Sequence, residues 1–289
     1  MEINVSKNLF GNRIDKEFRL LYNSIYSAKC KKDDPIYCGF GKIKTQGPQS
    51  LAVSRIGGFC VKICGLMKLT LLDFPGKVAC TVFLGGCNFR CPFCHNAELA
   101  FEGCGDEISE EDFFKFLEKR KGILDGVCVS GGEPLLYDEI IPFLKKIKDK
   151  GFAVKLDTNG CFPERLEAVI VAKACDYVAM DVKNSLQEYG KTVGIENFDS
   201  GGVEKSIEIL KTSGIDHEFR TTVVKGLHTE KSIEDISLLL KNEKKYFLQA
   251  FVKSDRVPDN TLEEYTKDEL ENLLRIAQRN VPDAVLRGI

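Results

Sequence analysis

Three thiols stand close together in the stretch CNFRCPFC, which contains Cys87, Cys91 and Cys94. Three residues separate the first pair and two separate the second, and no fourth cysteine follows at a similar interval. A closed zinc site takes four protein ligands, and an electron-transfer iron–sulfur cluster normally takes four thiolates. Three thiolates can instead hold three irons of a [4Fe–4S] cluster. The fourth iron then keeps an open position for a substrate, as catalytic zinc sites do.

Two nearby residues could complete a four-ligand site, and each is a poor fit. His95 directly follows Cys94, so the two side chains diverge and rarely reach one ion. Cys104 could reach the other thiols only if the chain looped back. Zinc binding and simple electron transfer therefore remain minor alternatives. The chain has 12 cysteines, and in a reducing cytoplasm we expect most of the others to pack as small apolar side chains rather than form a disulfide framework.

The chain from about residue 61 onward alternates between two kinds of segment. Short stretches rich in apolar and β-branched residues predict buried strands, and each is followed by an amphipathic stretch that predicts a helix. We expect strands at 78–84, 125–132, 152–160, 175–183, 216–224 and 245–251. We expect helices at 109–121, 137–151, 163–174, 201–214, 230–243 and 266–280.

These six strand–helix units have short connections, which implies a parallel sheet with helices outside it. Six units are too few for a closed eight-stranded barrel. We therefore predict an α/β fold of the partial (βα)6 barrel type, with an open and curved parallel sheet. A doubly wound sheet is the second choice. In either arrangement the functional site lies at the carboxyl ends of the strands.

Glycine and charged residues stand where several of these strands end. Glycines let backbones approach closely, and a carboxylate can complement an ammonium group. An aspartate suits ribose hydroxyls, and a lysine or arginine suits a carboxylate. A simple turn would explain the stretch DTNG equally well, and Arg220 could be a solvated charge. The residues expected at this rim are Gly131, Gly132, Glu133, Asp157, Asp181, Lys183 and Arg220.

Charge and hydropathy narrow the class of protein. The net charge of −2 gives no general attraction to nucleic acid or to anionic membranes. No apolar run approaches the roughly 18 residues of a membrane helix, and the chain does not begin with a signal-peptide pattern. We therefore predict a cytoplasmic protein. Residues 1–60 carry 10 basic and 5 acidic residues and fit no strand–helix unit, so we expect an irregular or flexible extension before one domain at 61–289.

The cysteine stretch resembles the C-x3-C-x-aromatic-C motif of the radical S-adenosylmethionine (SAM) superfamily. The resemblance implies that Cys87, Cys91 and Cys94 ligate a [4Fe–4S] cluster whose open iron binds the amino and carboxylate groups of SAM, and that Phe93 packs near the adenine. Electron transfer from the cluster would cleave SAM into methionine and a 5′-deoxyadenosyl radical. The cofactors carry that chemistry, and the protein positions them. No catalytic base is expected, because hydrogen-atom abstraction by a carbon radical needs none.

The stretch SGGEP, one strand–helix unit after the cysteines, resembles the GGE motif of the same superfamily. In that family the motif meets the SAM amino group, which implies this role for Gly131, Gly132 and Glu133. The remaining contacts with SAM would come from Asp157, Asp181, Lys183 and Arg220.

Further stretches narrow the resemblance to the activating enzymes of glycyl radical enzymes. DFPG before the first expected strand, CHN after the last cysteine, and then SGGEP, DTNG and DVK follow in that group's order over roughly residues 61–251. The chain most resembles the longer form of the activating proteins of anaerobic ribonucleoside-triphosphate reductase. The pyruvate formate-lyase activating enzyme is the close runner-up, although its late SAM-binding histidine has no counterpart in LQAFVKSD.

The resemblance implies an oxidoreductase that removes a hydrogen atom from a backbone glycine of a partner enzyme and leaves a glycyl radical there. The expected cofactors are the [4Fe–4S] cluster and SAM. The expected partners are that enzyme and a low-potential electron donor such as flavodoxin or ferredoxin. A radical SAM enzyme that acts on a small molecule is the lesser alternative, because fold and cofactor do not fix the substrate.

Overall fold

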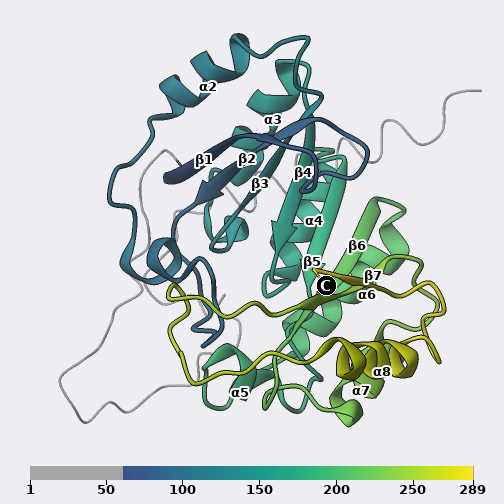
Figure 1. Cartoon of the computed structure of the whole chain (residues 1–289). Coiled ribbons are helices and arrows are strands. Elements are labelled where there is room, and N and C mark those ends of the chain that lie inside the picture. The colour runs from purple at the N-terminus through teal and green to yellow at the C-terminus, as the bar shows by residue number, and fades with distance from the viewer. Residues whose placement is uncertain (1–60, 289) are drawn as a thin grey trace, which may run out of the picture. The chain divides into compact units, whose positions relative to one another are not determined.

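The computed structural model describes residues 61–288, and the predicted extension at 1–60 lies outside the described residues. The described residues form one eight-stranded sheet whose strands stand in sequence order (Figure 1). β1 is antiparallel to β2, and all the later neighbours are parallel. The strands are β1 Ile63–Thr70, β2 Ala79–Leu84, β3 Gly126–Gly131, β4 Ala153–Thr158, β5 Tyr177–Asp181, β6 Asp216–Val223, β7 Tyr246–Ala250 and β8 Val285–Arg287.

All six expected strands are present as β2 to β7, which confirms the parallel part of the fold. Two further strands have weak sequence patterns. β1 exposes Met67 and Leu69, so it lacks the continuous buried pattern of a central parallel strand. β8 has only three residues. The two strands extend the sheet at its opposite edges.

The strand order decides between the two predicted arrangements. In a doubly wound sheet the order reverses at one point, and helices cover both faces. Here the parallel strands follow one another without reversal, and right-handed crossovers then place every connecting helix on the same face. The doubly wound alternative is therefore wrong. β1 and β8 are the two ends of the order and do not pair with each other, so the sheet is open, as predicted for a partial barrel.

The six expected helices are also present, with shorter bounds than the sequence indicated. α8 begins at a reciprocal capping box between Thr266 and Glu269, and α4 begins at Pro163. None of the helices in the described part of the chain is long and apolar enough to cross a membrane. The helices are α2 Glu110–Glu118, α3 Ile140–Asp149, α4 Pro163–Val171, the short α5 Tyr189–Val193, α6 Gly201–Ser213, α7 Glu230–Leu239 and α8 Lys267–Ala277, with single turns η1 Glu98–Glu102 and η2 Pro134–Leu136.

The two faces of the sheet differ in polarity. Between the sheet and its helices lies an apolar core, in which Phe113 of α2 and Phe143 of α3 are buried with their ring centroids 5.7 Å apart. The other face carries polar groups. Glu218 of β6 accepts a hydrogen bond from the Tyr177 hydroxyl at 3.1 Å, and Arg287 of β8 donates to both of its oxygens at 3.1 and 3.2 Å. The interior of the partial barrel is therefore polar and suited to a polar ligand.

The DFPG element closes the amino ends of the strands. Phe74 is buried, and its ring centroid lies 6.1 Å from that of Tyr177 at the start of β5. Gly126 at the start of β3 leaves room for this ring, because an added Cβ would lie 2.9 Å from it. The element therefore seals the end opposite to the strand ends where the cysteines lie.

Candidate functional site

The three cysteines lie in the loop that leaves the carboxyl end of β2. Gly86, directly before Cys87, donates its backbone N–H to the Leu99 carbonyl at 2.9 Å, which ties the loop to the segment that follows it. All three cysteines are free thiols. Cys91 is buried, whereas Cys87 and Cys94 are partly exposed. The structure therefore presents the donor set that a three-thiolate [4Fe–4S] cluster requires, in one backbone-anchored loop.

Burial controls the protonation of these thiols. It raises the pKa of Cys87 to about 12 and that of Cys91 to about 11, and it also raises the pKa of Cys94. The Lys183 ammonium acts in the opposite direction on all three. Such thiols stay protonated until a metal displaces the protons. Iron binding at this loop therefore releases protons and is favoured at higher pH.

The arrangement of the thiols does not suit a single metal ion. Among the described residues, no group of three or more His, Cys, Asp or Glu is placed to hold one ion. The thiolates of a cluster can lie further apart, because each is bonded to a separate iron. His95 is exposed, and its Nε2 lies 2.8 Å from the Val252 carbonyl oxygen. It therefore contacts the segment after β7 rather than the thiols.

One disulfide departs from the expectation for the remaining cysteines. Cys64 of β1 and Cys104 are bonded to each other, across a sequence separation of 40 residues. The expectation that most of the remaining cysteines pack as small apolar side chains does not hold for this pair. It holds for Cys80 and Cys175, which are buried free thiols.

Gly131, the last residue of β3, packs against β2, and Gly132 packs against the start of the cysteine loop. Gly131 has a φ of +119°, a conformation that favours glycine. An added Cβ at Gly132 would lie 2.6 Å from the carbonyl carbon of Gly86 and closer still to its oxygen. The N–H of Gly132 donates to Leu84, and that of Glu133 donates to Gly86, each at 2.9 Å. Glycine is therefore required here for contact between two loops, before any ligand is considered.

Glu133 has no exposed surface, and its carboxylate accepts hydrogen bonds from its own chain. The two oxygens accept hydrogen bonds from the Leu135 N–H at 2.9 Å, the Thr158 hydroxyl at 2.8 Å and the Asn159 N–H at 2.6 Å. The sequence predicted that this carboxylate complements the SAM ammonium. In the structure this carboxylate links the loop after β3 to the end of β4, and its contact with the SAM ammonium stays a prediction. The backbone of the two preceding glycines is partly exposed, and its contact with SAM also stays a prediction.

Burial raises the pKa of Glu133 from 4.5 to about 7, against the three hydrogen bonds that lower it. A carboxyl whose pKa is raised on folding stabilises the fold fully below its unfolded pKa, and this contribution is lost as the pH rises through the folded pKa. Glu133→Gln is neutral at every pH. We therefore expect the free energy of unfolding to fall between pH 5 and pH 8 by about 1–3 kcal/mol more in the wild type than in this variant.

Urea unfolding at the two pH values, under reducing conditions, measures that difference. Glu196→Gln is the matched control, because Glu196 is exposed and should leave the pH dependence at its wild-type value. Identical pH dependences in the wild type and in Glu133→Gln would show that the buried carboxyl titrates normally.

An ion-pair network joins the ends of β4, β5 and β6. The Arg220 guanidinium donates to Asp181 at 2.8 Å and contacts Asp157 at 3.5 Å. Lys183 pairs with Asp181 at 3.0 Å, and Lys155 pairs with Asp157. Burial alone would raise the pKa of both carboxyls, but the adjacent cations hold these pKa values below the usual range. The structure thus brings together four of the five charged rim residues that the sequence predicted, and Glu133 lies outside this network.

Lys155 is the member of this network that sequence reasoning missed. Its side chain is 1% exposed, and its ammonium also lies 3.8 Å from the Cys128 sulfur. A signal was available, because residues two apart on a strand share a face. Lys155 stands two positions before Asp157 in β4.

Lys183 is held through its backbone as well as its side chain. Its N–H donates to the Tyr189 hydroxyl at 3.2 Å, and His228 Nε2 lies 2.7 Å from its carbonyl oxygen. The Val224 N–H donates to His228 Nδ1 at 3.1 Å, so the proton of this neutral ring is on Nε2. The ring centroid of His228 lies 6.5 Å from that of Phe93 in an edge-on contact. Phe93 is buried, and its contact with adenine stays a prediction.

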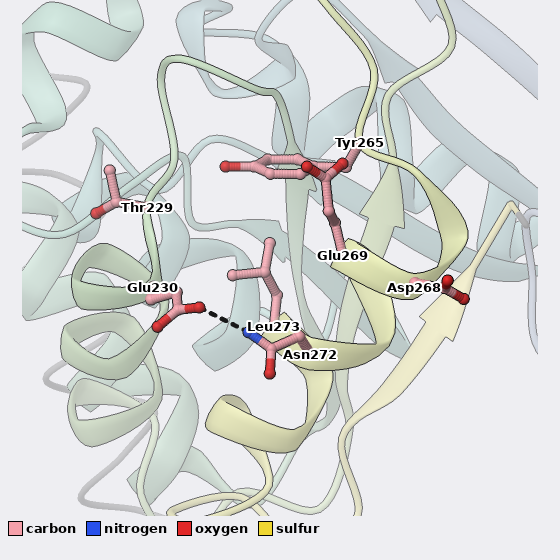
Figure 2. A pocket seen from close by; sticks show the side chains of 7 residues that line it. All are labelled: Thr229, Glu230, Tyr265, Asp268, Glu269, Asn272 and Leu273. Carbon is pink, nitrogen blue, oxygen red and sulfur yellow. Dashed lines mark hydrogen bonds between the residues drawn. The ribbon is translucent and has the colours of Figure 1, made fainter.

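A separate cavity of about 520 Å³ lies between the starts of α7 and α8 (Figure 2). In it, Glu230 accepts a hydrogen bond from Asn272 at 2.6 Å. The Tyr265 hydroxyl donates to the His228 carbonyl oxygen at 2.5 Å. The cavity is thereby connected to His228, which contacts the backbone of Lys183. None of the predicted site residues lines this cavity. Its lining consists of Thr229, Glu230, Tyr265, Asp268, Glu269, Asn272 and Leu273.

Comparison with known proteins agrees with this geometry. Residues 81–240 match the Radical SAM superfamily. The chain therefore belongs to the radical SAM superfamily, whose members use a [4Fe–4S] cluster and SAM. The donor set of the cysteine loop fits that cluster.

Two relatives indicate to which group within the superfamily the chain belongs. A protein of Methanocaldococcus jannaschii that carries the name of a glycyl-radical enzyme activating enzyme is 34% identical over 235 residues, covering 78% of this chain and 96% of that protein. The pyruvate formate-lyase-activating enzyme of Clostridium pasteurianum is 29% identical over 222 residues, covering 74% and 89%. Within the superfamily the chain falls in the group of glycyl-radical-enzyme activating enzymes, which confirms the finer resemblance.

A solved structure shares the fold. Streptococcus suis SuiB bound to S-adenosylmethionine superposes with a TM-score of 0.56 and 16% identity, over 70% of this chain and 48% of that chain. At this level of identity the likeness concerns the fold alone, and it agrees with the open partial barrel.

Proposed function

We propose that this chain installs a glycyl radical on a partner enzyme and that the partner is anaerobic ribonucleoside-triphosphate reductase. The observation that carries the proposal is the set of three free thiols in the loop after β2, beside a charged rim on β4 to β6. The choice of partner is supported by the order of the stretches DFPG, CHN, SGGEP, DTNG and DVK along the chain.

A [4Fe–4S] cluster held by the three cysteines would supply the electron that cleaves SAM. The role of the protein itself is to bind and orient SAM. The rim network contains three cations and two carboxylates, which leaves one positive charge in excess. An excess cation favours an anionic group such as the SAM carboxylate. We assign that contact to Lys183, because its ammonium also acts on all three thiols, and we keep Arg220 as the bridge between the two aspartates.

The hydrogen atom would come from a backbone glycine, so a loop of the partner must enter the strand-end opening. An open sheet leaves room for such a loop, whereas a closed barrel would not. The electron would come from a low-potential donor such as flavodoxin or ferredoxin. We propose the cytoplasm as the location, and neither nucleic acid nor membrane has a part in the reaction.

Electron paramagnetic resonance of the partner tests this function. Anaerobically reconstituted and reduced protein should release 5′-deoxyadenosine from SAM, and the reductase should then show the doublet of a glycyl radical. Cys91→Ala should reduce both signals to background, because it removes one of the three cluster ligands. Cys175→Ala is the matched control, since Cys175 is another buried free thiol outside the motif. Full iron content in Cys91→Ala would refute the ligand assignment.

Pyruvate formate-lyase is the second candidate partner, favoured by the relative from Clostridium pasteurianum. The absence of a histidine from the stretch LQAFVKSD argues against it. A doublet on a formate-lyase but not on the reductase would reverse the choice. Release of 5′-deoxyadenosine with no radical on either protein would instead favour a small-molecule substrate.

A further inference from the structure

Asn159 is the first residue after β4 and lies between the cysteine loop and Glu133. It is 6% exposed, so its polar atoms need partners within the protein. Its Oδ1 accepts the backbone N–H of Cys161 at 2.9 Å, which fixes the plane of the amide. Nδ2 is consequently directed toward the cysteine loop by the turn itself.

Two acceptors in the cysteine loop share that amide. Asn159 Nδ2 lies 2.8 Å from Asn88 Oδ1 and 3.9 Å from Cys87 Sγ. An amide carries two N–H donors, so one can serve each acceptor. The Cys87 sulfur also accepts the backbone N–H of Phe89 at 3.4 Å. This ligand sulfur therefore has one backbone donor and one side-chain donor.

The backbone of Asn159 faces the other negative group in this region. Its N–H donates to the Glu133 carboxylate at 2.6 Å. That carboxylate has no exposed surface. Asn159 thus directs one donor to the carboxylate and another to the sulfur.

We propose that Asn159 is a positioning residue for the cluster, whose side-chain amide donates an N–H···S hydrogen bond to Cys87 and so raises the reduction potential. This inference rests on the cluster assignment and is independent of which partner receives the radical. Hydrogen bonds to cluster sulfurs are among the factors that set iron–sulfur potentials, because a donor stabilises the more electron-rich reduced state. Outer hydrogen bonds also orient metal ligands.

Asn184 provides a matched control at the next strand end. Its Oδ1 likewise accepts the N–H of a following residue, Ser185, at 2.8 Å. Its Nδ2, however, donates to Thr192 at 2.8 Å and to Leu227 at 3.0 Å, and it has no cysteine as an acceptor. Both side-chain oxygens accept a backbone N–H from a residue that follows closely in the chain, but of the two amides Asn159 alone reaches a proposed cluster ligand.

The test is a redox titration of the full-length, anaerobically reconstituted protein without SAM, followed by electron paramagnetic resonance. Asn159→Ser keeps a hydroxyl in the turn but cannot reach the sulfur, and Asn159→Asp replaces the donor with a negative charge. Both midpoint potentials should lie below that of the wild type, with the aspartate variant lower. Iron release to a chelator should be several-fold faster in both. Asn184→Ser should match the wild type in both measurements.

Asn88→Ala separates the hydrogen bond from simple packing, because it removes the other acceptor of the amide and keeps the N–H donor to the sulfur. Its potential should equal or exceed that of the wild type. The proposal is overturned if both Asn159 variants hold wild-type iron at the wild-type potential, or if Asn88→Ala lowers the potential as much as Asn159→Ser does. Loss of iron from both Asn159 variants with an unchanged circular dichroism spectrum supports the positioning role.

Discussion

Gly132→Ala should destroy the contact between the two loops that carry the site. The added Cβ would lie 2.6 Å from the Gly86 carbonyl carbon and 3.3 Å from the Cys87 backbone nitrogen. These are backbone atoms, which cannot rotate away as the end of a side chain can, so the strain falls on the first cluster ligand. We expect a loss of about 3 kcal/mol in the free energy of unfolding, at the upper end of overpacking costs. Reconstituted protein should bind little iron.

Urea unfolding of the apo protein and the iron and sulfide content after reconstitution measure these two effects. Gly105→Ala is the matched control, because an added Cβ at Gly105 meets nothing within 4 Å. It should change stability by no more than about 0.5 kcal/mol. Full iron content and wild-type stability in Gly132→Ala would mean that the loops are not packed together as described.

Features with a local pattern could be predicted from the sequence. The cysteine spacing needs only eight residues, and the six central strands are continuous buried runs. Asp181 ends β5, and Asp157 stands one residue before the end of β4, so their convergence follows from the parallel sheet alone. Arg220 lies within β6 but pairs in register with Asp181, so the network with Lys183 and Arg220 follows from the alignment of neighbouring parallel strands.

Features that depend on distant contacts could not be predicted. The direction of the Glu133 side chain is set by donors at Thr158 and Asn159, which lie 25 and 26 residues further along the chain. His228 has no sequence signal, because the three histidines of the chain form no cluster, yet its Nε2 lies against the carbonyl oxygen of Lys183, 45 residues away. A search for clusters of like residues misses a histidine whose partners are backbone atoms.

The glycine motif shows that one sequence pattern can have two physical explanations. Glycines at 131 and 132 suggested close approach of a ligand to the backbone, and the structure shows close approach of another loop. The two explanations are compatible, since a ligand bound at the cysteine loop also lies against this backbone. The packing demand is the stronger one, because it applies to the apo protein as well.

Arg220→Met should cost the fold about 3 kcal/mol at pH 7, as expected when one partner of a buried ionic network is removed. Arg220 contacts both Asp157 and Asp181, and its side chain is only 14% exposed, so solvent screens these pairs little. A carboxyl with a depressed pKa stabilises the fold above its unfolded pKa and loses that contribution as the pH falls through the folded pKa. The difference between wild type and variant should therefore be full at pH 7 and shrink below about pH 4.

A double-mutant cycle in urea unfolding separates this network from a general loss of packing. Lys231→Met is the surface control, because the Lys231 side chain is 72% exposed in its pair with Asp235, and the substitution should leave the stability close to that of the wild type. Asp181→Asn should cost less in the Arg220→Met background than in the wild type, with a coupling energy of at least about 1 kcal/mol. If the losses in the free energy of unfolding were additive, Arg220 and Asp181 would act independently, and the ion-pair network would not contribute to stability as a unit.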